Sequence, residues 1–133
     1  MNFSAIYWCI RKGFPIRSLW TCDLCYYKLP ASTHISHPYG ITVANGAEIG
    51  ENVFISPNVT IGVSTIRYNK SGWDPGDSQS AKIGNRVFIG AGTVILGDIT
   101  IADDCIIGAG SIVISSFPEP GSIIVGSPAK RIR

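Results

Sequence analysis

The sequence predicts an all-β solenoid built on a six-residue repeat, and three observations lead to this prediction. Ile or Val recurs at every sixth position in two long stretches of the 133-residue chain. The residue that follows is small in eight of these ten cases. A period of six matches neither the roughly 3.6-residue period of a helix nor the long alternation of a sandwich strand. The ten positions are Val43, Ile49, Ile55, Ile61, Ile83, Ile89, Ile95, Ile101, Ile107 and Val113.

Residues 1–24 precede the repeat and are expected to form a short arm or helix. The segment holds Trp8, Phe14 and Trp20 together with several basic residues. Packed on the open end of the solenoid, it would cover strand edges that otherwise template aggregation. A membrane-surface role is the alternative, since Trp beside Lys and Arg also marks interfacial helices. No apolar run approaches the roughly 18 residues of a membrane span, and no signal peptide is expected.

The repeat domain is expected to cover residues 25–133. Each six-residue unit would supply one strand and one corner, and three units would close a triangular coil with its aliphatic residues inside. Residues 25–62 then make about two coils and residues 83–114 nearly two more, followed by a tail over 115–133. A second inward series supports this register: Leu29, Ile35, Ile41, Ala47, Val53, Val59, Val87, Thr93, Ile99, Cys105 and Ser111.

The segment 63–82 interrupts the repeat with about 16 extra residues. It is rich in turn-forming residues, including Gly72, Pro75 and Gly76, so it must leave the wall of the solenoid as a loop. Long loops in compact domains are usually functional or disordered. Because Trp73 is expected at the tip of this loop, we expect the loop to shape a ligand site or a subunit interface; a mobile insertion is the alternative.

The composition argues for self-association and against several partners. Charged residues make up 15% of the chain and hydrophobic residues 45%, so a small monomer would expose much apolar surface. The net charge of +2 is too small for a nucleic-acid footprint. Among the cysteines only Cys22 and Cys25 form a CxxC pair, without the second pair that a zinc site needs. We therefore expect a reduced, cytoplasmic protein without a metal.

Four motifs stand out in the repeat region: His37-Pro38-Tyr39-Gly40-Ile41-Thr42-Val43, Ile89-Gly90-Ala91-Gly92, Ile107-Gly108-Ala109-Gly110-Ser111 and Gly126-Ser127-Pro128-Ala129-Lys130. They resemble the hexapeptide-repeat acyltransferases, especially the branch of serine acetyltransferases and small polysaccharide O-acetyltransferases. The resemblance covers residues 25–133. It implies a left-handed parallel β-helix of about four coils, a homotrimer, and acetyl-CoA bound in the groove between neighbouring subunits.

His37 is the candidate general base. It falls on a step of the six-residue series where every later position is Ile or Val, so a ring would replace an aliphatic residue at a core position. A structural histidine at the end of the solenoid is the alternative, but in the family that the motif resembles this histidine is the catalytic base. His34 lies outside both inward series and is expected to face solvent or a subunit contact.

A neutral imidazole can accept the proton of an acceptor hydroxyl while its oxygen attacks the thioester of acetyl-CoA. No covalent acyl-enzyme is needed, and Cys105, the competing nucleophile, falls in the inward series. In the serine branch an aspartate 15 residues before the histidine orients the ring. That position is Cys22 here and Asp23 is one place off, so Asp23 or a backbone carbonyl is expected to do this.

The matching motifs also imply five residues that contact CoA: Ala91, Ala109, Ser115, Lys130 and Arg133. Small corner residues let the pantetheine approach the backbone, and the two basic residues can meet phosphates. Plain corner packing is the alternative for the two alanines, and a solvated basic end is the alternative for the two basic residues.

The acceptor is expected to be a hydroxyl of a sugar or of a surface-polysaccharide precursor, with Tyr39 and Trp73 as substrate contacts. Serine acetyltransferases carry a large helical domain before the β-helix, whereas only about 24 residues precede it here. They also carry a histidine where this chain has Ser80. A serine acetyltransferase-like enzyme and a non-catalytic β-helix that binds or supports other molecules are the alternatives.

Overall fold

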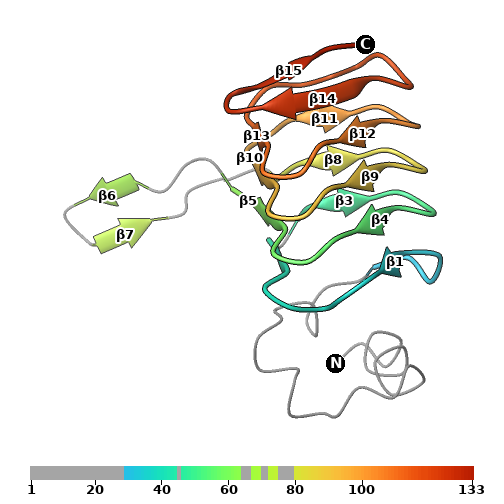
Figure 1. Cartoon of the computed structure of the whole chain (residues 1–133). Coiled ribbons are helices and arrows are strands. Elements are labelled where there is room, and N and C mark those ends of the chain that lie inside the picture. Colours follow the sequence, from blue (N-terminus) through green and yellow to red (C-terminus); the bar gives the residue numbers. More distant parts are fainter. Residues whose placement is uncertain (1–28, 45, 64–66, 70–71, 75–79) are drawn as a thin grey trace.

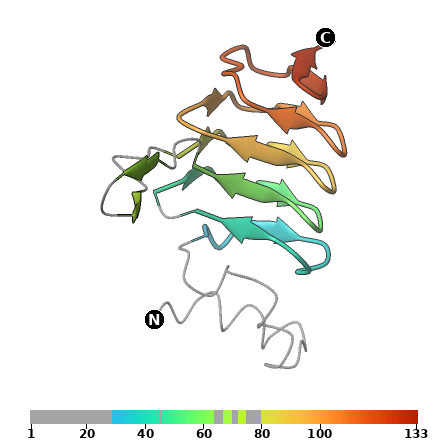
Figure 2. The ribbon, with the colours of Figure 1, turned by 90° about the vertical axis from the view of Figure 1, so that its left-hand side faces the viewer.

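The chain folds into a triangular stack of short β-coils (Figures 1 and 2). The computed structural model describes residues 29–133 except 45, 64–66, 70–71 and 75–79. Each coil contributes one short strand to each of three walls, because a corner interrupts the chain about every six residues. Within the described ranges there is no helix long and apolar enough to cross a membrane. The predicted arm over residues 1–24 lies outside the described residues.

Three sheets form the walls, named A, B and C in the order in which the chain visits them, and all their strands are parallel except the last strand of sheet A. Sheet A contains β1 (His34–Ile35), β4 (Phe54–Ile55), β9 (Phe88–Ile89), β12 (Ile106–Ile107), β14 (Ile123–Gly126) and β15 (Ala129–Arg131). Sheet B contains β2 (Thr42–Val43), β5 (Thr60–Gly62), β10 (Val94–Leu96) and β13 (Ile112–Val113). Sheet C contains β3 (Glu48–Ile49), β8 (Lys82–Ile83) and β11 (Thr100–Ile101).

The two predicted series fill the core. Nine of the ten residues in the first series are buried, and Ile49, the tenth, is partly buried and packs against the core. In the second series every residue from Ile41 to Ser111 is buried. Isoleucine and valine suit these positions because their restricted χ1 matches a stacked, pleated wall. The six-residue register is therefore confirmed from residue 41 to residue 113.

The register expected at residue 37 is wrong. Ile35 pairs with Ile55 and Val43 pairs with Ile61, so eight residue steps separate these inward positions in the first coil, against six in the next. The first corner therefore contains two extra residues. Ile35, not His37, takes the inward place, and His37 lies exposed on the lengthened corner.

The interruption of the repeat leaves the wall as predicted. β5 ends at Gly62 and β8 begins at Lys82. Between them, β6 (Arg67–Asn69) and β7 (Gly72–Asp74) pair as an antiparallel hairpin that projects from the stack (Figure 1). Trp73 lies in β7 opposite Tyr68 rather than at a turn.

The segment expected as a C-terminal tail continues the solenoid. Phe117 forms an isolated parallel bridge to Ile101 of sheet C, and β14 adds to sheet A beside β12. The chain then reverses, and β15 pairs antiparallel with β14 as the last strand of the sheet. Lys130 and Arg131 are exposed on this edge strand, where charged residues discourage pairing with another chain.

Candidate active site

The residues of the predicted motifs meet along one edge of the prism, between sheets A and B. Each corner on this edge is hydrogen-bonded to the corner of the neighbouring coil. The N–H of Asn58 donates to the carbonyl oxygen of Tyr39 at 2.8 Å. The N–H of Gly92 donates to Pro57 at 3.0 Å, and that of Gly110 to Ala91 at 2.8 Å. We call this column of corners the A/B edge.

The C-terminal motif joins the same edge. The N–H of Gly126 lies 3.3 Å from the hydroxyl oxygen of Ser111, and Ser111 in turn donates to the carbonyl oxygen of Gly108 at 2.6 Å. Lys130 follows in β15, opposite Val125. All four motifs singled out in the sequence therefore contribute to the A/B edge.

His37 begins the first corner of the A/B edge. Tyr39 donates its N–H to the carbonyl oxygen of His37 at 2.9 Å, which closes a three-residue turn. Pro38, the central residue of this turn, is buried, whereas His37 and Tyr39 are exposed. An exposed imidazole held by a tight turn can reach a bound hydroxyl and accept its proton. Asp23, expected to orient this ring, lies outside the described residues.

Ala91 and Ala109 are exposed at the tips of the next two corners after Asn58. Each is followed by a glycine with φ +69°, and the space where a Cβ would stand on these glycines is empty. The backbone is therefore bare at both corners, so an extended ligand can approach it closely. Thr93 also donates to Gly108, at 3.2 Å, and helps to hold the corner that carries Ala109.

The other residues predicted to bind CoA are distributed over two places. Ser115 lies on a different edge, between β13 of sheet B and the bridge that Phe117 makes to sheet C. The structure therefore does not bring Ser115 to the A/B edge. Lys130 and Arg133 are exposed at the C-terminal end. Arg131, between them, pairs with Glu119 and donates its Nε–H to the carbonyl oxygen of Arg133 at 2.9 Å.

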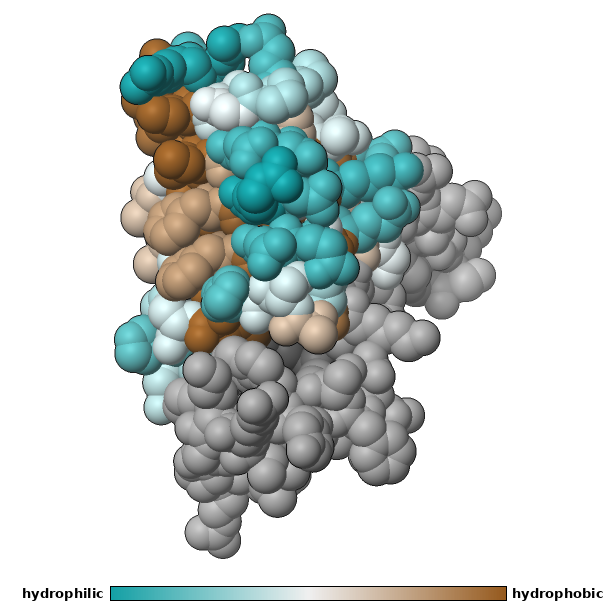
Figure 3. Space-filling view, turned by 90° about the vertical axis from the view of Figure 1, so that its right-hand side faces the viewer, coloured by the Kyte–Doolittle hydropathy of each residue, from teal (hydrophilic) through white to brown (hydrophobic). Residues whose placement is uncertain are grey.

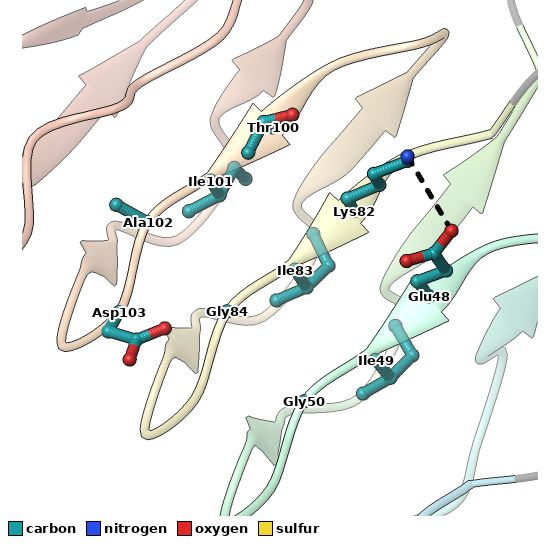
Figure 4. A pocket seen from close by; sticks show the side chains of 10 residues that line it. All are labelled: Glu48, Ile49, Gly50, Lys82, Ile83, Gly84, Thr100, Ile101, Ala102 and Asp103. Atoms are coloured by element: carbon teal, nitrogen blue, oxygen red, sulfur yellow. Dashed lines mark ion pairs between the residues drawn. The ribbon is translucent and has the colours of Figure 1, made fainter.

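A shallow hollow lies on the outer face of sheet C, away from the A/B edge (Figure 4). Lys82 and Glu48 form an exposed ion pair of 3.6 Å at one side of it, and Asp103 lies at the other. Both partners of the ion pair are more than half exposed, so water screens their attraction. The hollow does not include any of the predicted site residues.

Comparison with known proteins gives consistent results. Residues 80–115 match the family described as bacterial transferase hexapeptide (six repeats). A serine acetyltransferase of Helicobacter pylori is 37% identical over 105 residues, which cover 79% of this chain and 56% of that protein. The galactoside O-acetyltransferase of Escherichia coli is 34% identical over 122 residues, which cover 86% of this chain and 60% of that protein.

Among solved structures, the serine acetyltransferase of Brucella abortus in complex with coenzyme A is similar to this chain. The TM-score is 0.64 at 35% identity, over 75% of this chain and 36% of that one. This chain thus spans less than two thirds of each of these three proteins. Its fold is the left-handed parallel β-helix of hexapeptide repeats. Through residues 80–115 the chain carries the repeats of the hexapeptide transferase family.

Proposed function

We propose that the protein is an O-acetyltransferase that moves the acetyl group of acetyl-CoA to a hydroxyl acceptor. One observation carries the proposal: the turn of His37, the bare corners of Ala91 and Ala109 and the C-terminal motif share the A/B edge. This edge offers a base at one end and an extended open backbone next to it. The named activities of the relatives and the coenzyme A in the Brucella abortus enzyme support the same reaction.

In the proposed mechanism His37 acts as the general base. A ring nitrogen accepts the proton of the acceptor hydroxyl while the oxygen forms a bond to the thioester carbonyl carbon. The carbon–sulfur bond then breaks, and the sulfur leaves with the proton from the imidazolium as free CoA. Lys130 and Arg133 would meet the phosphates of the nucleotide. Asp23 or a backbone carbonyl remains the candidate for orienting the ring.

We propose a homotrimer in which the A/B edge lies between subunits. The outer faces of the two sheets beside this edge carry exposed large apolar residues: Phe88 and Ile106 on sheet A and Ile112 on sheet B are 37–46% exposed, although sheet B also presents Thr42 and Thr60. Sheet C instead presents Glu48, Lys82 and Thr100. A cyclic assembly buries two different faces of each subunit and leaves the rest to solvent. The difference in outward-facing residues between sheet C and sheets A and B fits this arrangement.

The comparisons favour a serine acetyltransferase-like enzyme over the sugar O-acetyltransferase expected from the sequence. Most of the similar proteins are serine acetyltransferases. One specific observation keeps the sugar acceptor as a second candidate: Ser80, not histidine, stands before β8, and its buried hydroxyl finds no partner among the described residues. A galactoside O-acetyltransferase is also among the relatives. The expected cytoplasmic location stays a prediction.

The substitution His37→Ala tests the proposed mechanism. General base catalysis is worth about 10²- to 10⁴-fold, so release of free thiol from acetyl-CoA should fall by at least about 100-fold. Binding of CoA, followed by calorimetry, should persist because the other corners are unchanged. His34→Ala is the matched control, since His34 is also exposed and lies only three residues away. Unchanged turnover in the His37 variant would contradict the mechanism.

A comparison of acceptors separates the remaining functions. Thiol release from acetyl-CoA is followed with L-serine and with a panel of mono- and disaccharides. If L-serine is acetylated and the sugars are not, the protein is the serine-type enzyme. If a sugar is acetylated and L-serine is not, the protein is the second candidate. If CoA does not bind at all, the protein is a non-catalytic β-helix and the proposed function is wrong.

A further inference from the structure

The corner that carries His37 differs from the other corners of the A/B edge. It contains two extra residues, because Ile35 and not His37 pairs with the inward column. A longer corner has more conformations, so holding its histidine in one place requires additional contacts. Asn58, from the next coil, donates its N–H to Tyr39 and thereby makes one of these contacts.

Asn58 occupies a position that recurs in the repeat. The equivalent residues in the next two coils are Gly92 and Gly110, and all three have left-handed backbone conformations, with φ of +59°, +69° and +69°. Glycine adopts this conformation without steric cost, and asparagine adopts it more readily than most other residues. Glycine therefore satisfies the backbone at this position in three other coils, as Gly40, Gly92 and Gly110. The backbone hydrogen bond to the preceding corner therefore does not need the side chain of Asn58.

The side chain of Asn58 packs on the corner of His37. Its Oδ1 atom occupies the space that a Cβ on residue 40 would need, and residue 40 is a glycine with φ +63°. Asn58 thus contacts the corner twice, through its N–H at Tyr39 and through its carboxamide at Gly40. No such side chain stands over Gly92 or Gly110, where a Cβ would meet nothing within 4 Å.

We propose that Asn58 is a positioning residue that fixes the lengthened corner and so holds His37 for catalysis. The inference rests on the proposed function of His37 as the base. Asn58 acts through the corner and needs no contact with the acetyl group. The carboxamide is the part of Asn58 that matters, since glycine would provide the same backbone hydrogen bond.

Asn58→Gly is the variant that tests this inference. It keeps the left-handed backbone and the N–H to Tyr39 but removes the carboxamide. A misplaced catalytic group costs up to about 100-fold in rate, so kcat should fall by about 10- to 100-fold. The KM for acetyl-CoA should not change, because Ala91 and Ala109 lie on other corners. Asn52→Gly is the matched control, since Asn52 has φ +57° and lies on another edge of the same coil.

A second measurement does not depend on activity. The chain has two histidines, so the ring signals of His37 in an NMR spectrum can be assigned by comparison with His37→Gln. In the absence of any acceptor, Asn58→Gly should shift or broaden the ring signals of His37, and Asn52→Gly should not. The melting temperature of both variants should stay at or above that of the wild type, because glycine tolerates the backbone conformation.

The outcomes separate the inference from the proposed function. If the wild type transfers no acetyl group, the proposed function fails, and the ring signals alone decide whether Asn58 positions His37. Full kcat or unchanged ring signals in Asn58→Gly would overturn the inference. A loss of activity that comes with a lower melting temperature would also overturn it, because the role of Asn58 would then be general stability.

Discussion

Four charged or polar residues form a hydrogen-bonded column on the edge between sheets C and A. Asn85 donates its backbone N–H and its carboxamide to Asp103 at 2.8 and 3.2 Å. Arg86 donates to both oxygens of Asp104 at 2.6 and 2.9 Å. The column is seen in teal beside the brown apolar face of sheet A (Figure 3). Hydrogen bonds from Asn85 lower the pKa of Asp103, and the hydrogen bond from Arg86 lowers the pKa of Asp104.

These pKa values predict a loss of stability in acid. A carboxylate with a lowered pKa in the folded state stabilises the fold above its unfolded pKa, and this contribution disappears as the pH falls through the folded pKa. Stability should therefore begin to fall below about pH 4 and continue to fall towards pH 3. The stability of the Asp103→Asn variant should fall less over this pH range than that of the wild type. The measurement is urea denaturation of both proteins at a fixed protomer concentration between pH 7 and pH 3.

Asp98→Asn is the control for the acid prediction, because Asp98 is an exposed aspartate on the edge between sheets B and C. This variant should follow the wild type over the whole pH range. If Asp103→Asn also follows the wild type, the hydrogen bonds of the column do not contribute to the pH dependence. Because the charged residues of the column are partly exposed, salt screens the attraction between them. The denaturation should therefore be measured at low ionic strength.

At the level of single residues, the sequence predicted the identity of the candidate base but not its surroundings. His37 was found through its motif, whereas its supposed core position followed from counting in sixes across a corner that holds two extra residues. The count failed because the two extra residues place Ile35 six residues before Ile41, which imitates one step of the second series although Ile35 pairs with Ile55 of the first. Asn58 was missed because the sequence does not reveal backbone angles. The structure shows that Asn58 has the same left-handed conformation as Gly92 and Gly110, its equivalents in the next two coils.

At the level of elements, the corners rather than the strands limit which residues the fold accepts. Gly90 begins the corner after β9 and is buried. A Cβ on this residue would stand 2.5 Å from the backbone nitrogen of Ala109 and 2.8 Å from the carbonyl oxygen of Ile107. Neither atom can move without separating two coils. The glycine is therefore required by close stacking of backbones and not by its own φ angle.

Gly90→Ala should destabilise the protein by about 1 to 3 kcal/mol, the usual cost of overpacking. The measurement is the urea midpoint at a fixed protomer concentration, since any subunit association contributes to stability. Gly62→Ala is the control, because its Cβ would meet side-chain atoms alone, the flexible end of Leu96 at 3.0 Å and the methyl group of Thr60 at 3.9 Å. That variant should differ little from the wild type. Equal losses in the two variants would show that backbone stacking at the corner is not the cause.

The interruption of the repeat shows what periodicity can and cannot predict about an element. Because the inward series stops at Ile61 and resumes at Ile83, the departure of the chain from the wall was visible in the sequence. The strands β6 and β7 were not, since a two-stranded hairpin outside the core carries no inward series. Turn residues such as Gly72 dominate its composition and masked its strand character.

At the level of the whole molecule, the three walls have different outer surfaces although the same repeat builds them. Phe54 and Phe88 stack on sheet A with ring centroids 5.2 Å apart, and Ile106 continues this apolar strip in the next coil. On sheet C the corresponding outward positions are Glu48, Lys82 and Thr100. The inward residues of a solenoid define its coils, so the outward residues are free to define its assembly.

The proposed trimer therefore makes a prediction that compares consecutive strands on two different walls, β11 of sheet C and β12 of sheet A. Ile106→Lys places a charge on sheet A, and Thr100→Lys places the same charge on sheet C. An unpaired charge buried at an interface costs several kcal/mol, so only the first variant should dissociate and lose transfer activity. Light scattering reports the mass of each variant, and circular dichroism checks that the monomer keeps its coils. A monomeric wild type, or a trimer that survives Ile106→Lys, would mean that the A/B edge works without a neighbouring subunit on sheet A.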